Sequence, residues 1–304
     1  MPYDSIVCVK QVPDTANVTA EAMKEDGTVN RAALPTIFNP EDLHALETAL
    51  EVRDQYGGTV TAVSMGPPKA ADVLRDCLYR GADRAILLTD RRAAASDTLA
   101  TSYILSQAVR TIGRYDFVFC GRQAIDGDTA QVGPQCAEKL GITQVTYLEK
   151  VVQLDGGRVQ IRRNVGHGWE IVEARLPVLV TVVQTANVPR PPAAKRVMRL
   201  KRARVAAEVA AEVRTAMPDA PEEQQAAEVG CRLESLKQQK LLIEQWNLDD
   251  IHADLGRCGL AGSPTKVFRI QAIVLTKSGY TEVAPTKEGV GQLIHELVVD
   301  RTLG

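Results

Sequence analysis

The sequence contains two short segments whose glycines and polar side chains could hold a nucleotide. The longer one reads GRQAIDGDTAQVGP over residues 121–134. Its glycines allow a ligand to approach the backbone, Arg122 supplies a cation for phosphate, and Asp126 or Asp128 can accept a hydrogen bond from a ribose hydroxyl. The two glutamines can bind the polar edges of a ring. A purely structural loop is the alternative, since Gly and Asp also dominate turns.

The second segment reads ASDTLATS over residues 95–102. Asp97, or the serine before it, is suited to cap a helix, and the hydroxyls of Thr98, Thr101 and Ser102 would then lie in the first turn. The free N–H groups of such a turn attract phosphate. A well-capped surface helix is the alternative, although capping alone does not require three further hydroxyls.

Both segments follow short apolar runs that are typical of buried strands. Four such runs each precede a longer stretch of helical period, at Ser5–Val9, Val60–Ser64, Ala85–Leu88 and Phe117–Cys120. This βαβ series predicts an α/β fold with a mainly parallel sheet and helices on both faces. In such a sheet, ligands bind outside the carboxyl ends of the strands, which is where both segments would lie.

The pattern changes after this series. Val151–Leu154 and Arg158–Ile161 flank an Asp-Gly-Gly turn, and strand-like runs follow at Glu170–Glu173 and Val178–Val183. We therefore expect an antiparallel extension of the sheet. The prolines after Asn187 cannot lie inside a central strand or a helix, so they predict a surface arm and a boundary between units at 1–186 and 187–304.

The second unit has a helical composition. Residues 205–245 are rich in Ala, Glu, Gln and Lys and predict two helices broken at Met217–Ala220. Further on, we expect a strand at Ala272–Leu275 and an amphipathic helix around Glu288–Val299. A C-terminal segment this ordered must pack on this chain or on a partner.

Several functional classes find no support in the sequence. The net charge of −2 gives no general attraction to nucleic acid or anionic membranes. The start lacks a charged n-region and a long apolar h-region, so we expect a cytoplasmic protein without membrane insertion. The six cysteines form no CxxC pair and the histidines no HxxxH, so no metal site is predicted. GxSxG and GxGxxG are absent, which argues against serine hydrolysis and an ordinary NAD-binding Rossmann site, and no residue is assigned a catalytic role.

The same segments resemble the beta subunit of electron-transfer flavoproteins over nearly the whole chain. The matching stretches are CVKQVPDT at 8–15, NPEDLHALETALEV at 39–52, AVSMGP at 62–67, GADRAILL at 81–88, GRQAIDGDTAQVGP at 121–134 and RLPVLVTV at 175–182. The resemblance implies an adenine nucleotide between strand ends and a heterodimer with an alpha subunit. It also implies electron exchange with flavin dehydrogenases, such as an acyl-CoA dehydrogenase.

The segments LLTDRRAAASDTLATSY at 87–103 and GLAGSPTKVFRIQAIVL at 259–275 resemble the subgroup whose beta subunit binds FAD. Conventional members hold a structural AMP, which is the alternative for this chain. Many members of the FAD-binding subgroup perform flavin-based bifurcation, which implies NADH as electron donor or acceptor and ferredoxin as a further partner. Carried over by position and combined with the two segments, the expected cofactor contacts are Cys8, Asn39, Met65, Asp97, Thr98, Thr101, Gly121, Arg122, Gln123, Asp126, Gly127, Asp128, Thr129, Ala130, Gln131 and Val132.

The resemblance places the partner-recognition arm at Asn187–Leu200, with Arg190, Ala194, Lys195 and Arg196 as contacts. This chain departs from the family pattern at two places that affect which partner it binds. Ala194 stands where the family has a leucine anchor, and residues near 203–236 look like an insertion. The basic run in this arm has two other interpretations. It could be a solvated surface or, less well supported because no aromatic residues interleave, a nucleic-acid contact.

Two other functions remain as alternatives. An ATP-using synthetase or pyrophosphatase would need a Gly- and Ser-rich loop after the first strand, where KQVPD stands at 10–14 instead. A non-catalytic nucleotide-sensing module needs no flavin and would be colourless.

Overall fold

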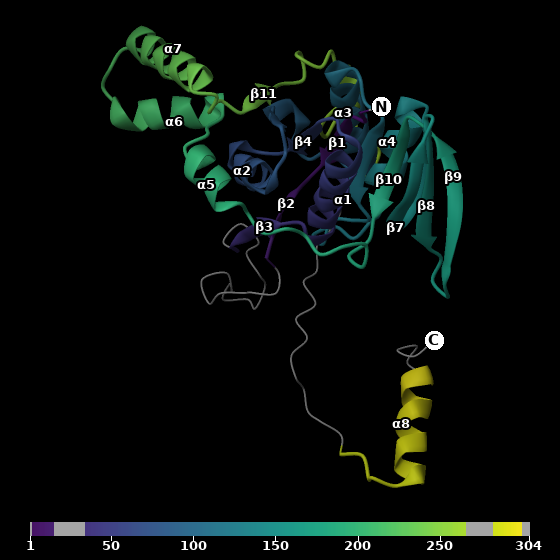
Figure 1. The fold of residues 1–304 in the computed structure, drawn as a ribbon. Helices are drawn as coiled ribbons and strands as arrows, with labels where there is room; N and C mark the ends of the chain where they lie inside the picture. Colours follow the sequence, from purple (N-terminus) through teal and green to yellow (C-terminus); the bar gives the residue numbers. More distant parts are fainter. Residues whose placement is uncertain (1, 15–33, 266–281, 300–304) are drawn as a thin grey trace.

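The computed structural model of the chain describes residues 2–14, 34–265 and 282–299. Within them, nine strands form one sheet in the order β11-β5-β4-β1-β6-β10-β7-β8-β9, with β11 and β9 at the two edges (Figure 1). The pairs from β11 to β7 are parallel, and β8 and β9 are antiparallel. The predicted α/β sheet with an antiparallel extension is therefore confirmed. The bounds are β1 Ser5–Cys8, β4 Val60–Met65, β5 Arg84–Leu88, β6 Phe117–Gly121, β7 Thr143–Asp155, β8 Arg158–Asn164, β9 Trp169–Arg175, β10 Val178–Val182 and β11 Glu244–Trp246.

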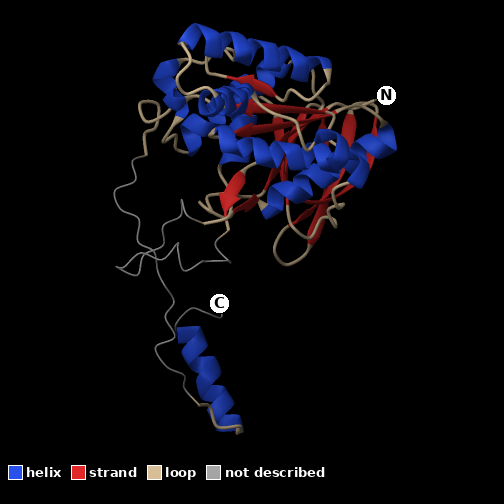
Figure 2. Ribbon diagram, turned by 90° about the vertical axis from the view of Figure 1, so that its left-hand side faces the viewer, coloured by secondary structure: helices blue, strands red, loops and turns tan. Residues whose placement is uncertain are grey.

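Helices cover both faces of the parallel part, as Figure 2 shows around the strands. Helices α1 (Pro40–Tyr56) and α2 (Ala71–Arg80) pack in one apolar core. Helices α3 (Thr98–Ile112) and α4 (Val132–Leu140) pack side by side in a second core on the other face. Two layers of helix explain why the central strands are apolar on both sides.

Strand β10 shows this most clearly, because all five of its residues are buried. It lies between β6 and the first part of β7, and the later part of β7 turns outward to pair with β8. The apolar run predicted at Val178–Val183 is thus a central strand, although it is the last of the four strands predicted after residue 150. Its position fits a segment without polar alternation.

The chain after β10 returns to the same sheet. Helix α5 (Ala194–Leu200) packs on α2, and α6 (Ala206–Ala216) and α7 (Glu222–Gln238) pack on each other, broken where the sequence predicts. Strand β11 then pairs with β5. This strand is absent from the sequence-based prediction, because the short run at 244–246 follows a long helical pattern without a turn signal.

Helix α8 (Lys287–Val299) lies apart from the sheet in both views (Figures 1 and 2). Its apolar residues Val290, Leu293, Ile294 and Val298 are exposed. The predicted helix is confirmed, whereas the strand predicted at Ala272–Leu275 lies outside the described residues. No helix of the described part is long and apolar enough to span a membrane. The remaining elements are a ribbon of β2 (Gln11–Pro13) with β3 (Thr36–Phe38) and the 3₁₀ turns Pro68–Ala70, Arg91–Ala93 and Leu255–Arg257.

Candidate functional site

The candidate site lies where the order of the sheet reverses. From β1 the chain runs outward through β4 to β5, and it then crosses back to β6 on the other side of β1. The loops after β1 and β6 therefore lead to helices on opposite faces, and in open parallel sheets ligands bind at such a point, outside the carboxyl ends of the strands. Both sequence-predicted segments reach this edge, one after β5 and the other after β6.

The first turns of α3 and α4 are joined at this edge. The Thr98 hydroxyl donates to Oε1 of Gln131 at 2.8 Å, and the Ser102 hydroxyl lies 3.2 Å from Oε1 of Gln135. The start of α4 has no side-chain cap, so its first N–H groups form a positive dipole end beside the hydroxyls at the start of α3. This is an arrangement that favours an anionic group such as a phosphate.

The role of Asp97 differs from that of the threonines that follow it, because its hydrogen bonds are structural. Its carboxylate accepts from the backbone N–H of Ala100 and of Thr265, each at 3.0 Å. Burial alone would raise the pKa of Asp97, but these donors outweigh it and hold the pKa below its ordinary value. Asp97 therefore caps α3 and fastens a distant segment to it.

That segment, residues 259–265, closes over the loop after β5. The Ser263 hydroxyl is buried, accepts from the backbone N–H of Asp97 at 2.8 Å and donates to the carbonyl of Gly259 at 2.7 Å. Gly259 donates in turn to the Ser96 hydroxyl. Sequence reasoning did not place these residues at the site. The resemblance of 259–275 to the same subgroup was the only available signal.

Residues at the start of α1 fix the loop after β6 through hydrogen bonds. Asn39 is fully buried, and its amide donates to the carbonyl of Gln123 at 2.9 Å and accepts from the N–H of Ile125 at 3.1 Å. Glu41 accepts from the N–H of Gln123 and pairs with Arg122, both at 2.8 Å. In this structure Asn39 therefore positions the loop through both of its amide atoms.

Asp42 completes this support with a buried carboxylate. Its oxygens accept from the backbone N–H groups of Lys10 at 2.9 Å and Gly121 at 3.0 Å. Burial raises the pKa of Asp42 from 3.8 to about 7, because the two donors compensate only part of the cost of a buried charge. The loops after β1 and β6 thus meet at one ionisable group.

The outer part of this loop has an unusual backbone. Asp128 and Ala130 adopt positive φ angles of 48° and 54°, which cost non-glycine residues energy. Left-handed residues alternating along a loop turn successive N–H groups to one side and form anion-binding nests. Gly127, Asp128 and Thr129 are exposed here, and Gln123 donates to Asp128 at 3.0 Å.

Two charged groups lie beside this backbone. Asp126 is paired with the Lys10 ammonium at 2.8 Å. The Nε atom of Arg122 is buried without a hydrogen-bond partner in the described structure. An unsatisfied buried donor is costly, so this guanidinium fits a site that an anion completes.

The remaining predicted contacts lie at strand ends. Cys8 and Met65 end β1 and β4, and Val132 begins α4. Cys8 lies opposite Cys120 in the register of β1 and β6. Its hydrogen bond and burial raise the pKa of the Cys120 thiol, so this neighbour stays protonated and is a poor nucleophile.

The arm residues are engaged with this chain to different degrees. Arg190 pairs with Glu47 at 2.9 Å and with Asp54 at 2.8 Å, and Arg196 donates to carbonyls at the end of α2. Ala194 and Lys195 are exposed. The arm is therefore fixed on α1 and α2 by its arginines, while its other side faces outward.

Comparisons of the sequence with known proteins show the family of the chain. A family model described as electron transfer flavoprotein domain matches residues 26–213. The chain belongs to this family. It is 40% identical over 292 residues to the electron transfer flavoprotein subunit beta of Clostridium acetobutylicum, covering 96% of each chain. The identity to the subunit beta of Megasphaera elsdenii is 47% over 274 residues, with 87% of this chain and 86% of the relative covered.

A third relative is named as part of a larger assembly. It is the caffeyl-CoA reductase-Etf complex subunit CarD of Acetobacterium woodii, 36% identical over 300 residues, with 98% of this chain and 94% of the relative covered. The chain is therefore a beta-type subunit of an electron-transfer flavoprotein, and beta subunits of this family work with an alpha subunit.

Proposed function

We propose that this chain binds FAD at the carboxyl ends of β1 and β6 and, with its alpha subunit, passes electrons between NADH, a flavin dehydrogenase and ferredoxin by bifurcation or its reverse. The contact between Thr98 and Gln131 carries the proposal, because it brings two helix N-termini together at the strand ends. The uncapped start of α4 suits one phosphate and the hydroxyls at the start of α3 can donate to a second, so the pair suits the diphosphate of a dinucleotide, whereas the single phosphate of AMP needs only one of them.

The residues of this chain also fit the rest of such a ligand. The unsatisfied Nε of Arg122 and the left-handed backbone at Asp128 and Ala130 add donors on the β6 side of the site. Bound FAD would supply acceptance of a hydride from NADH and release of single electrons. The task of the protein is then to orient the cofactor and exclude competing reactions.

The alpha subunit would also account for the exposed face of α8. Four apolar residues at helical spacing, Val290, Leu293, Ile294 and Val298, are exposed on this helix. We propose that it packs on the alpha subunit, as the C-terminal part of residues 187–304. The outward side of the arm, with Ala194 and Lys195, would remain available to the dehydrogenase.

The flavin content of the co-purified heterodimer tests the cofactor. The bound nucleotides are released by denaturing the purified heterodimer, and FAD and AMP are then quantified. We expect two FAD per heterodimer. One FAD with one AMP would assign this chain to simple electron transfer with a structural nucleotide. A colourless preparation would instead support a nucleotide-sensing module.

A further inference from the structure

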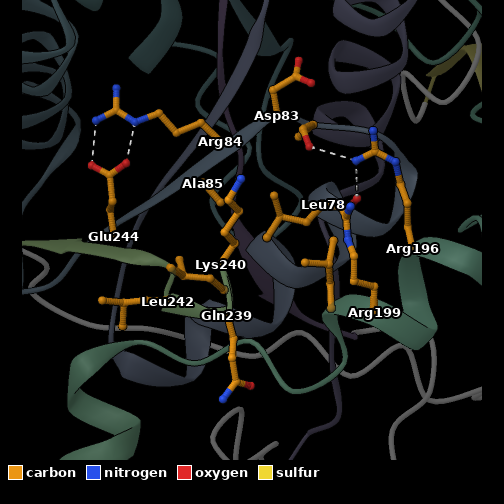
Figure 3. A pocket seen from close by; sticks show the side chains of 13 residues that line it. Leu78, Asp83, Arg84, Ala85, Arg196, Arg199, Gln239, Lys240, Leu242 and Glu244 are labelled. Carbon is orange, nitrogen blue, oxygen red and sulfur yellow. Dashed lines mark hydrogen bonds and ion pairs between the residues drawn. The ribbon is translucent and has the colours of Figure 1, made fainter. Parts of the chain in front are cut away.

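A pocket lies at the opposite ends of the strands from the proposed nucleotide site. It has a volume of about 390 Å³ and is bordered by the beginnings of β5 and β11, by α5 and by the residues that follow α7 (Figure 3). No residue expected at the flavin site borders it. Its size is at the lower end of pockets that hold small molecules.

The pocket gathers more positive than negative charge. Four cationic residues and two acidic ones line it, while the whole chain has a net charge of −2. Arg84 is neutralised by Glu244 through two bonds of 2.6 Å. Asp83 accepts from the backbone N–H of Val60 at 2.9 Å and from Arg53 at 3.3 Å, so its carboxylate already has partners.

The other three cations have no carboxylate partner among the described residues. They are Arg196, Arg199 and Lys240. Arg196 is held in place because it donates to the carbonyls of Leu78 and Ala82 at 3.2 Å each. Arg199 follows it at i+3 on the same side of α5, and Figure 3 shows both side chains along one wall of the pocket. Like charges on one side of a helix repel each other, and an anion between them removes this repulsion.

Lys240 occupies a position where glycine is preferred. Its φ is +56°, and the bonds from Leu241 to the carbonyl of Leu236 and from Lys240 to that of Lys237 form the usual C-terminal motif of a helix. A residue with a side chain is strained in this left-handed conformation, whereas glycine is not. The ammonium group that this conformation places beside the pocket is a reason to retain a costly residue (Figure 3).

We propose that this pocket binds a small phosphorylated molecule, with Arg199 and Lys240 as its charged contacts. Arginine forks match phosphate oxygens, and an ammonium adds a point charge, so the set suits a dianion better than a neutral ligand. Since α5 belongs to the arm and Lys240 ends the α6–α7 pair, the ligand would connect these two parts.

Calorimetric titration of the heterodimer with inorganic pyrophosphate tests this site, with ionic strength held constant by NaCl. We expect one saturable site, weakened at least about tenfold by Lys240→Gly and by Arg199→Gln. Arg202→Gln is the matched control, because Arg202 is exposed nearby but does not line the pocket. Lys240→Gly should leave the thermal stability unchanged or higher, so a loss of binding in this variant cannot come from unfolding.

Three outcomes would overturn the proposal. The first is no saturable heat with the wild type. The second is wild-type affinity in both pocket variants, which would place the pyrophosphate elsewhere, for example in the proposed nucleotide site. The third is equal weakening by Arg202→Gln, which would mean general attraction to a basic surface.

Discussion

The Thr98 hydroxyl and Oε1 of Gln131 are 2.8 Å apart, so one hydrogen bond joins the starts of two helices that leave different strands. We predict that replacing Thr98 and Thr101 together by valine lowers the retention of the flavin. Hydrogen bonds to charged oxygens contribute roughly 1–3 kcal/mol each, so the affinity should fall at least about tenfold. The measurement is flavin absorbance per heterodimer after gel filtration.

Thr111→Val is the matched control, because this threonine lies at the far end of the same helix and its hydroxyl bonds only to the carbonyl of Gln107. Full flavin content in the double variant would refute the phosphate contact.

The variant with valine at positions 98 and 101 also tests where NADH reacts. Rapid mixing with NADH should show no fast bleaching once this flavin is lost, whereas persistent fast reduction would place the hydride acceptor on the alpha subunit.

Gly121 should tolerate no side chain, because a Cβ there would lie 2.5 Å from Oδ1 of Asp42 and 2.7 Å from backbone atoms of α1. We predict that Gly121→Ala lowers the free energy of unfolding by about 1–3 kcal/mol, since backbone must move. It should also reduce nucleotide binding by displacing the loop. Urea unfolding and flavin content measure the two effects. Gly127→Ala is the control for stability in the same loop, because a Cβ there meets open space and the free energy of unfolding should change little.

Asp42 and Asp97 should give stability opposite dependences on pH. The pKa of Asp42 is raised from 3.8 to about 7, so between these values the folded chain holds a proton that the unfolded chain has released. The contribution of Asp42 to the free energy of unfolding therefore falls as the pH rises through this window. The pKa of Asp97 is lowered, so its contribution is present above the ordinary pKa and is lost as the pH falls through the folded value.

Urea unfolding at several pH values tests these signs in Asp42→Asn and Asp97→Asn. In Asp42→Asn, the slope of the free energy of unfolding against pH should become more positive between pH 3.8 and about 7. In Asp97→Asn, the free energy of unfolding should be lower than in the wild type only above the pKa that Asp97 has in the folded chain. Asparagine keeps the cap on Ala100, so the helix start survives in the second variant. An unchanged pH profile in Asp42→Asn would mean that this carboxyl is ionised throughout.

The sequence predicted the parallel sheet well, because apolar strands buried on both faces have no other stable environment. Strands β1, β4, β5 and β6 begin and end within one residue of the expected positions. Neither β11 nor the short β2–β3 ribbon could be predicted. Such three-residue strands depend on a neighbouring edge and not on their own pattern.

The candidate site could likewise be predicted only in part. The two loops were predicted as a binding site from glycines, hydroxyls and charges that exceed the needs of a turn. Asp42 accepts from the backbone of Gly121, Glu41 from that of Gln123 and Ser263 from that of Asp97, each at least 79 positions away in sequence. A single sequence contains no periodic signal for such contacts, so the geometry of the fold was needed to find them.

The α6–α7 pair should be removable without loss of the flavin. Its ends lie side by side, because Arg204 donates to the carbonyl of Leu241 at 3.0 Å and accepts from Ile243 at 2.9 Å. Val209 and Val213 are buried but belong to neither core of the sheet, while Val205 belongs to the core beneath α1 and α2. The two helices therefore bury each other, as expected for helices near the ~12–15 residue limit of isolated stability.

We predict that this pair selects the redox partner. Replacing residues 206–239 by a short glycine-rich link keeps Val205 and β11, so flavin content and binding of the alpha subunit should remain. Electron delivery to the native dehydrogenase should fail, measured as dye reduction coupled to that enzyme. Glu208→Gln in the complete chain controls for the lost contact with Arg75, which lies 2.8 Å away and ties α6 to α2. If the shortened chain unfolds or loses its flavin while Glu208→Gln does not, the pair is a structural cover for this subunit and selects no partner.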